Sequence, residues 1–71
     1  MRVVFFSAGA VVFNEYGECA KIEGRLFHEL LKTFQDRKAI SRKSDKRIVR
    51  EIVESWPREK LEWVSVEQAN G

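Results

Sequence analysis

Seven basic side chains fall within residues 37–50, where Asp45 is the only acid, so this segment carries a charge of +6. The six bases and ten acids in the rest of the chain give −4. Guanidinium and ammonium groups bind phosphate oxygens and carboxylates, so this polarisation predicts a polyanion-binding segment, with nucleic acid as the expected ligand. A solvated loop that keeps the protein soluble fits the same composition. The candidate contacts are Arg37, Lys38, Arg42, Lys43, Lys46, Arg47 and Arg50.

Groups that could support catalysis or bind a metal are few. The chain has one histidine, His28, and one cysteine, Cys19, and nothing in their spacing places them together as a nucleophile and its base. Glu59, Glu62 and Glu67 do not follow a metal-ligand spacing, and the four glycines do not compose a phosphate-binding loop. We therefore predict no catalytic residue, no metal, no cofactor and no small-molecule substrate. Cys19 is expected to pack as a small hydrophobic residue.

With 71 residues, of which 44% are hydrophobic and 34% charged, the chain predicts one small globular domain. No apolar run approaches the roughly 20 residues that span a bilayer, and no secretory signal is recognisable. We expect a cytoplasmic protein that has no membrane partner and binds rather than catalyses.

Three strands are expected in the first third of the chain. Residues 2–6 are β-branched and aromatic and end at Ser7-Ala8-Gly9, which predicts a strand followed by a turn. Residues 10–13 are predicted to form its partner strand. Residues 14–17 are predicted to form a second turn, and residues 18–22 a third strand.

Two amphipathic helices follow. The spacing of Leu26, Phe27, Leu30, Leu31 and Phe34 predicts a helix over residues 25–36. A second helix begins after a cap at Ser41 or Ser44 and ends before Pro57, with a stripe of apolar residues at Ile48, Val49, Ile52, Val53 and Trp56.

The chain is expected to end with a strand over residues 61–66 and a polar, flexible tail over residues 67–71. The predicted fold is therefore a β-β-β-α-α-β domain of the α+β class, residues 1–66, with an antiparallel sheet and two amphipathic helices.

The first strand is apolar on both faces, and two helices have difficulty covering both faces of a sheet. Burial of both faces is the preferred interpretation. In the alternative, part of the sheet or its edge stays exposed and binds a protein partner. The candidate partner-binding residues are Val3, Phe5, Tyr16 and Trp63.

Residues 20–56 resemble winged-helix DNA-binding domains. The likeness rests on Lys21-Ile-Glu-Gly-Arg-Leu-Phe-His-Glu-Leu-Leu-Lys-Thr-Phe34, the link Ala39-Ile-Ser-Arg42, and Lys46-Arg-Ile-Val-Arg-Glu-Ile-Val53. The resemblance implies a winged-helix-like fold whose second helix enters the major groove, with contacts from Arg42, Lys43, Lys46, Arg47 and Arg50.

The short length, the hydrophobic opening Met-Arg-Val-Val-Phe-Phe and the segregated charge also resemble small bacteriophage-encoded regulators of host RNA polymerase. The chain is thus expected to be a non-enzymatic transcription regulator that binds DNA through residues 37–50. The alternative is a protein that binds host RNA polymerase and inhibits or redirects transcription. The sequence leaves the oligomeric state open.

Overall fold

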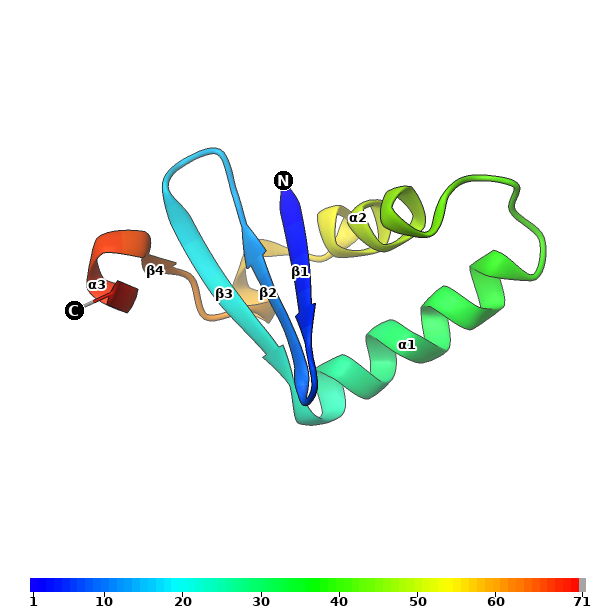
Figure 1. Ribbon diagram of the computed structural model, residues 1–71, viewed down its shortest axis with the longest axis horizontal. Helices are drawn as coiled ribbons and strands as arrows, with labels where there is room; N and C mark the ends of the chain where they lie inside the picture. Colours follow the sequence, from blue (N-terminus) through cyan, green and yellow to red (C-terminus); the bar gives the residue numbers. More distant parts are fainter. Residues whose placement is uncertain (71) are drawn as a thin grey trace.

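The computed structural model describes residues 1–70 and has the predicted α+β class, with three strands preceding two helices (Figure 1). Four strands form one antiparallel sheet in the order β1-β2-β3-β4. The first three are consecutive hairpin partners: β1 (Arg2–Phe6), β2 (Gly9–Phe13) and β3 (Glu18–Glu23).

Both turns between these strands lie close to their predicted positions. Asn14 Oδ1 accepts hydrogen bonds from the backbone N–H groups of Tyr16 and Glu18, and Gly17 adopts a positive φ of 75° that favours glycine. In the first turn the sequence interpretation was wrong by one residue. Gly9 belongs to β2, where it pairs with Phe6 of β1, and only Ser7 and Ala8 form the turn.

Helix α1 (Gly24–Lys38) is longer than predicted and contributes one fully buried side chain, Leu30. Its C-terminal half extends beyond the sheet (Figure 1). A link over residues 39–44 leads to α2 (Asp45–Ser55), which is capped at Ser44, one of the two predicted caps. The Ser44 hydroxyl accepts a hydrogen bond from the Arg47 N–H at 3.3 Å.

The stripe predicted for α2 is buried, with Ile48, Val49, Ile52 and Val53 each at most 5% exposed. Trp56 has an extended backbone, with ψ of 141°, and ends the helix. This is the conformation that Pro57 imposes on the residue before it.

The predicted strand over residues 61–66 is mostly wrong. A 3₁₀ turn, η1 (Arg58–Lys60), precedes it, Leu61 is buried in the core, and β4 comprises only Val64–Ser65. A short helix, α3 (Val66–Asn70), lies where a polar tail was predicted, and Gly71 falls outside the described residues.

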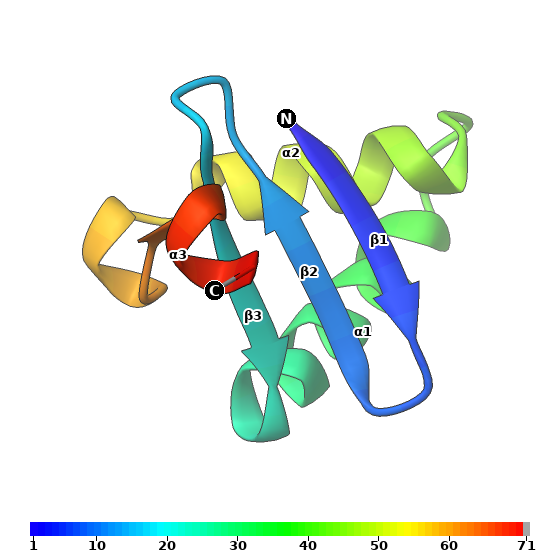
Figure 2. The same cartoon turned by 60° about the vertical axis from the view of Figure 1, so that its left-hand side comes forward.

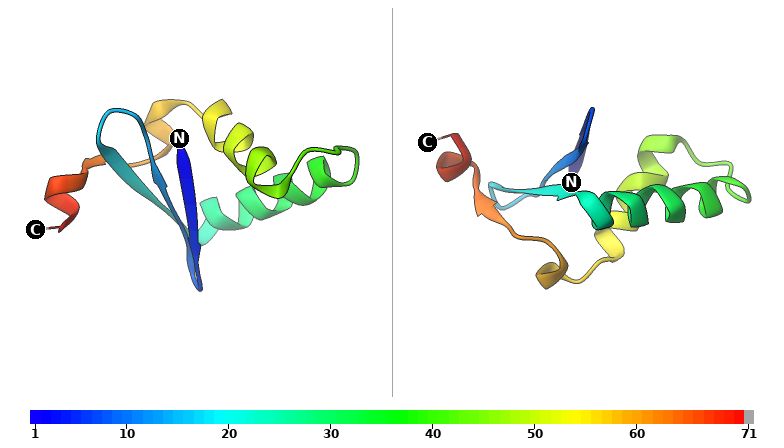
Figure 3. Two further views of the ribbon diagram at one scale, coloured as in Figure 1. Left: turned by 45° about the horizontal axis from the view of Figure 1, so that its top comes forward. Right: turned by 90° about the horizontal axis from the view of Figure 1, so that it is seen from below.

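Helices α1 and α2 both pack on one face of the sheet, and α3 lies on the other face beside β3 (Figures 2 and 3). The largest fully buried side chains of the resulting core are Ile22, Leu30, Ile48, Ile52 and Val12. On the opposite face Val4 and Phe6 are each 40% exposed. The preferred expectation that both faces are buried is therefore wrong, and part of the sheet is left as surface.

Candidate functional site

The predicted basic residues come together on three consecutive elements: the end of α1, the link, and the first turns of α2. All seven side chains are exposed. We call this set the basic corner: Arg37, Lys38, Arg42, Lys43, Lys46, Arg47 and Arg50.

Three members of the basic corner are engaged in ion pairs. Lys38 Nζ lies 2.5 Å from Asp45 Oδ1, and Lys43 Nζ lies 2.8 Å from Glu51 Oε1. Arg47 Nε contacts the other Glu51 oxygen at 3.3 Å. The hydrogen bond from Lys43 is the main reason that the pKa of Glu51 lies below its usual value. Exposed pairs of this kind contribute little free energy, so a polyanion can replace either carboxylate.

The other four members, Arg37, Arg42, Lys46 and Arg50, make no ion pair within residues 1–70. They distribute unneutralised positive charge over α1, the link and α2. Phosphate groups recur along a nucleic-acid backbone, so a surface of separated, uncompensated bases suits such a ligand.

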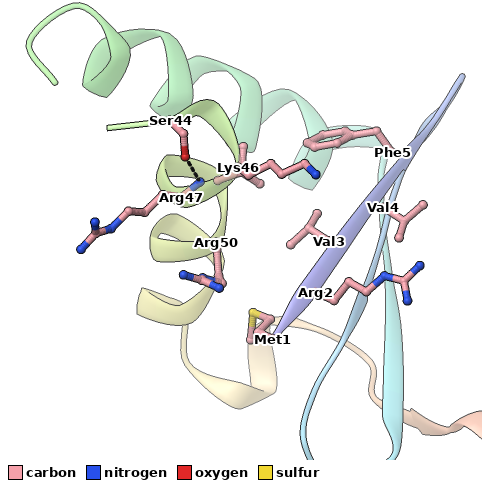
Figure 4. A pocket seen from close by; sticks show the side chains of 10 residues that line it. Met1, Arg2, Val3, Val4, Phe5, Ser44, Lys46, Arg47 and Arg50 are labelled. Atoms are coloured by element: carbon pink, nitrogen blue, oxygen red, sulfur yellow. Dashed lines mark hydrogen bonds between the residues drawn. The ribbon is translucent and has the colours of Figure 1, made fainter. Parts of the chain in front are cut away.

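A groove of about 730 Å³ lies between β1 and α2 (Figure 4). Met1, Val3 and Phe5 supply apolar surface from one side, and Lys46 and Arg50 supply charge from the other. The predicted basic set and part of the predicted partner set therefore meet here. Residue types alone could not show this, because β1 and α2 lie forty residues apart in sequence.

The predicted partner-binding residues do not form one surface. Val3 and Phe5 line the β1/α2 groove, whereas Tyr16 and Trp63 line a separate groove beside Trp56 and Arg58. Val3 and Trp63 are partly buried against the core, Phe5 is 49% exposed, and Tyr16 is 82% exposed.

Arg58 connects this second groove to the sheet. Its guanidinium lies 5.9 Å from the centre of the Trp63 ring and donates two hydrogen bonds, of 2.9 and 2.7 Å, to the Glu18 carboxylate. These bonds, together with one from Asn14, lower the pKa of Glu18 to about 2. Arg58 and Glu18 are thus occupied with each other, which indicates a structural role.

His28 is exposed on α1, whereas Cys19 is buried in β3, as predicted for a small packed residue. Over residues 1–70, histidine, cysteine and acidic side chains do not gather in any group of three that could hold a metal ion. Within the same part of the chain, no helix is both long and apolar enough to cross a bilayer.

Comparison with known proteins gave no match to a family model, to a curated protein or to a solved structure.

Proposed function

We propose that this protein is a non-enzymatic regulator that binds DNA through the basic corner and acts in the cytoplasm on transcription. The observation that carries the proposal is the set of four bases that make no ion pair within residues 1–70, distributed over α1, the link and α2. Polyanion binding gives this segregated charge a role, whereas the remaining surface carries the excess of acids.

The first turns of α2 are the part of the basic corner best suited to base contacts. Lys46, Arg47 and Arg50 are exposed there, while the opposite side of the helix is buried in the core. Arginine is the side chain that most often recognises guanine in the major groove, and it also binds phosphates bidentately. Arg37 and Arg42 lie outside this helix and serve as backbone contacts in the proposed complex.

The test is a fluorescence anisotropy titration of a mixed-sequence duplex at several salt concentrations. On a mixed-sequence duplex, where the α2 bases meet phosphates in place of a preferred base, the four bases without ion pairs within residues 1–70 predict a slope of log K against log salt of about −3.6. This is roughly a 150-fold loss of affinity between about 50 and 200 mM salt. Participation of all seven bases would steepen the slope to about −6. The slope therefore also measures whether the ion-paired bases exchange their carboxylates for phosphates.

Matched charge removals give the second measurement. The double variant Arg37→Gln/Arg42→Gln is expected to reduce the slope by about 2. Lys21→Gln/Lys32→Gln removes two exposed bases outside the basic corner and is expected to leave the slope nearly unchanged. Equal effects of the two double variants, or binding that ignores salt, would show that the basic corner is not the DNA site.

A second candidate function is the binding of RNA polymerase, as the resemblance to bacteriophage regulators suggests. The uncovered apolar side chains Val4 and Phe6 favour a protein partner, because exposed apolar patches commonly mark protein–protein contacts. Titration of the labelled protein with purified polymerase tests this candidate. Loss of signals from β1 and β2 supports it, and an unchanged spectrum excludes it.

A further inference from the structure

Strand β1 is an edge strand. It pairs with β2 on one side, no strand of residues 1–70 pairs with the other, and Figure 2 shows it at the margin of the sheet. In an antiparallel sheet, alternate residues of an edge strand direct their N–H and C=O groups outward. An extended segment of another chain can satisfy these groups by adding a strand.

The charged side chains that line the groove beside this edge are all basic. Lys46 extends from α2 toward Phe5, and Arg50 lies on the same helix nearer Met1 (Figure 4). Neither Lys46 nor Arg50 makes an ion pair within the described part of the chain. The residues lining the groove include no carboxylate.

We propose that the β1 edge binds an extended acidic segment of a partner protein as an added strand. Side chains of a strand alternate between its two faces, so those on the helix side of the sheet would stand between Val3 and Phe5 of β1 and the bases Lys46 and Arg50, where carboxylates would neutralise the two bases. Those on the other side would stand beside Arg2, Val4 and Phe6, and apolar residues there would cover the two exposed apolar side chains. The ligand is thus a segment of alternating carboxylate and aliphatic residues, about as long as β1.

Charge separates this ligand from a second copy of the chain. Pairing of β1 with β1 of another molecule would bring both sets of Lys46 and Arg50 to one face of a continuous sheet, where like charges repel. An acidic strand instead neutralises them. The proposal goes beyond DNA binding and does not depend on it, because main-chain pairing with β1 requires a peptide.

The probe is the synthetic peptide Glu-Val-Glu-Val-Glu-Val-Glu with blocked ends, added to the ¹⁵N-labelled protein at low salt. We expect amide shifts in β1, slowed hydrogen exchange of β1 amides, and shifts of Lys46 and Arg50. The charge-reversed peptide, with Lys in place of Glu, is expected not to bind. An analogue with alternate backbone nitrogens methylated, made in both registers, tests the strand pairing, because a methylated nitrogen cannot donate a hydrogen bond. At least one register is expected to lose binding.

Lys46 and Arg50 belong to both proposed sites, so the variant that separates them changes Arg37 and Arg42, which do not line the β1/α2 groove. Lys46→Gln/Arg50→Gln is expected to weaken peptide binding by about tenfold or more, whereas Arg37→Gln/Arg42→Gln is expected to change it little. All four residues are exposed, so the folded amide spectrum should persist in both variants. Equal binding of the Glu and Lys peptides, or of both methylated analogues, would overturn the proposal. Amide shifts that do not include β1 would also overturn it. Self-association through β1 in place of peptide binding would do the same. The assay contains no nucleic acid, so its failure leaves the DNA proposal standing.

Discussion

Substitution of Gly9 by alanine tests how tightly β2 and β3 approach beside the turn of the β1–β2 hairpin. Gly9 is buried, and an added Cβ would stand 2.3 Å from the carbonyl oxygen of Ile22, whereas such contacts essentially never fall below 3.0 Å. The backbone must therefore shift by about 0.7 Å. Ile22 is fully buried and held between β2 and the helices, so the shift propagates into the core.

The expected cost follows from two opposing terms. Overfilling a packed interior costs about 1–3 kcal/mol, and the reduced freedom of the unfolded chain offsets about 0.4–1 kcal/mol. The net destabilisation of Gly9→Ala is therefore about 1–2 kcal/mol, against a total stability of about 4–10 kcal/mol for a chain of this length. Such a change lowers the melting temperature by about 4–16 °C.

Urea and thermal unfolding followed by far-UV circular dichroism measure this difference. The control is Gly17→Asn, because Gly17 has a φ of 75° that asparagine tolerates and no atom stands within 4 Å of its added Cβ. We expect the control to stay within about 1 kcal/mol of the parent chain. A Gly9→Ala protein at least as stable as the parent would refute the close approach of β2 and β3.

Two further predictions concern the core and the sheet. Leu30→Ala is expected to destabilise the fold by about 3 kcal/mol, because Leu30 is fully buried. Its neighbour Leu31 is 39% exposed, so Leu31→Ala should cost less than about 1 kcal/mol. Urea unfolding of both variants measures the difference. The Glu18 carboxylate has a folded pKa of about 2, lowered chiefly by the hydrogen bonds from Arg58, so its pairing stabilises the protein above pH 4.5 and this contribution is lost as the pH falls toward 2. The melting temperature of Glu18→Gln should therefore fall less steeply than that of the parent over this range, and parallel pH profiles would contradict the pairing.

The sequence identified the elements whose signals are local. Alternation and β-branching marked the first three strands, and the apolar period marked α1 and α2, because these patterns decide which side chains one element can bury. The apolar residues from Leu61 to Val66 were misleading because they differ in burial: Leu61 is buried, Trp63 and Val66 are half-buried, and Val64 is exposed. Leu61 enters the helix-side core, and only Val64 and Ser65 remain to pair with β3.

The basic corner was visible in the sequence because its members are nearly contiguous. The ion pairs that neutralise part of the basic corner were not visible in the sequence, because the Lys43–Glu51 pair requires the link to fold back along α2. The β1/α2 groove was also hidden, because it depends on which face of the sheet the helices cover and not on any local pattern.

That choice of face follows from side-chain size. Ala10 and Ala20 lie on the helix side of β2 and β3 and are at most 3% exposed, and small side chains there let the helices approach the sheet closely. By strand alternation, the bulky rings of Phe6 and Phe13 lie on the opposite side. Helices packed over those rings would stand farther from the sheet and would leave Ala10 and Ala20 on the uncovered face. This packing therefore leaves Val4 and Phe6 as surface, and it sets Lys46 and Arg50 of α2, which make no ion pair within residues 1–70, beside the edge of β1.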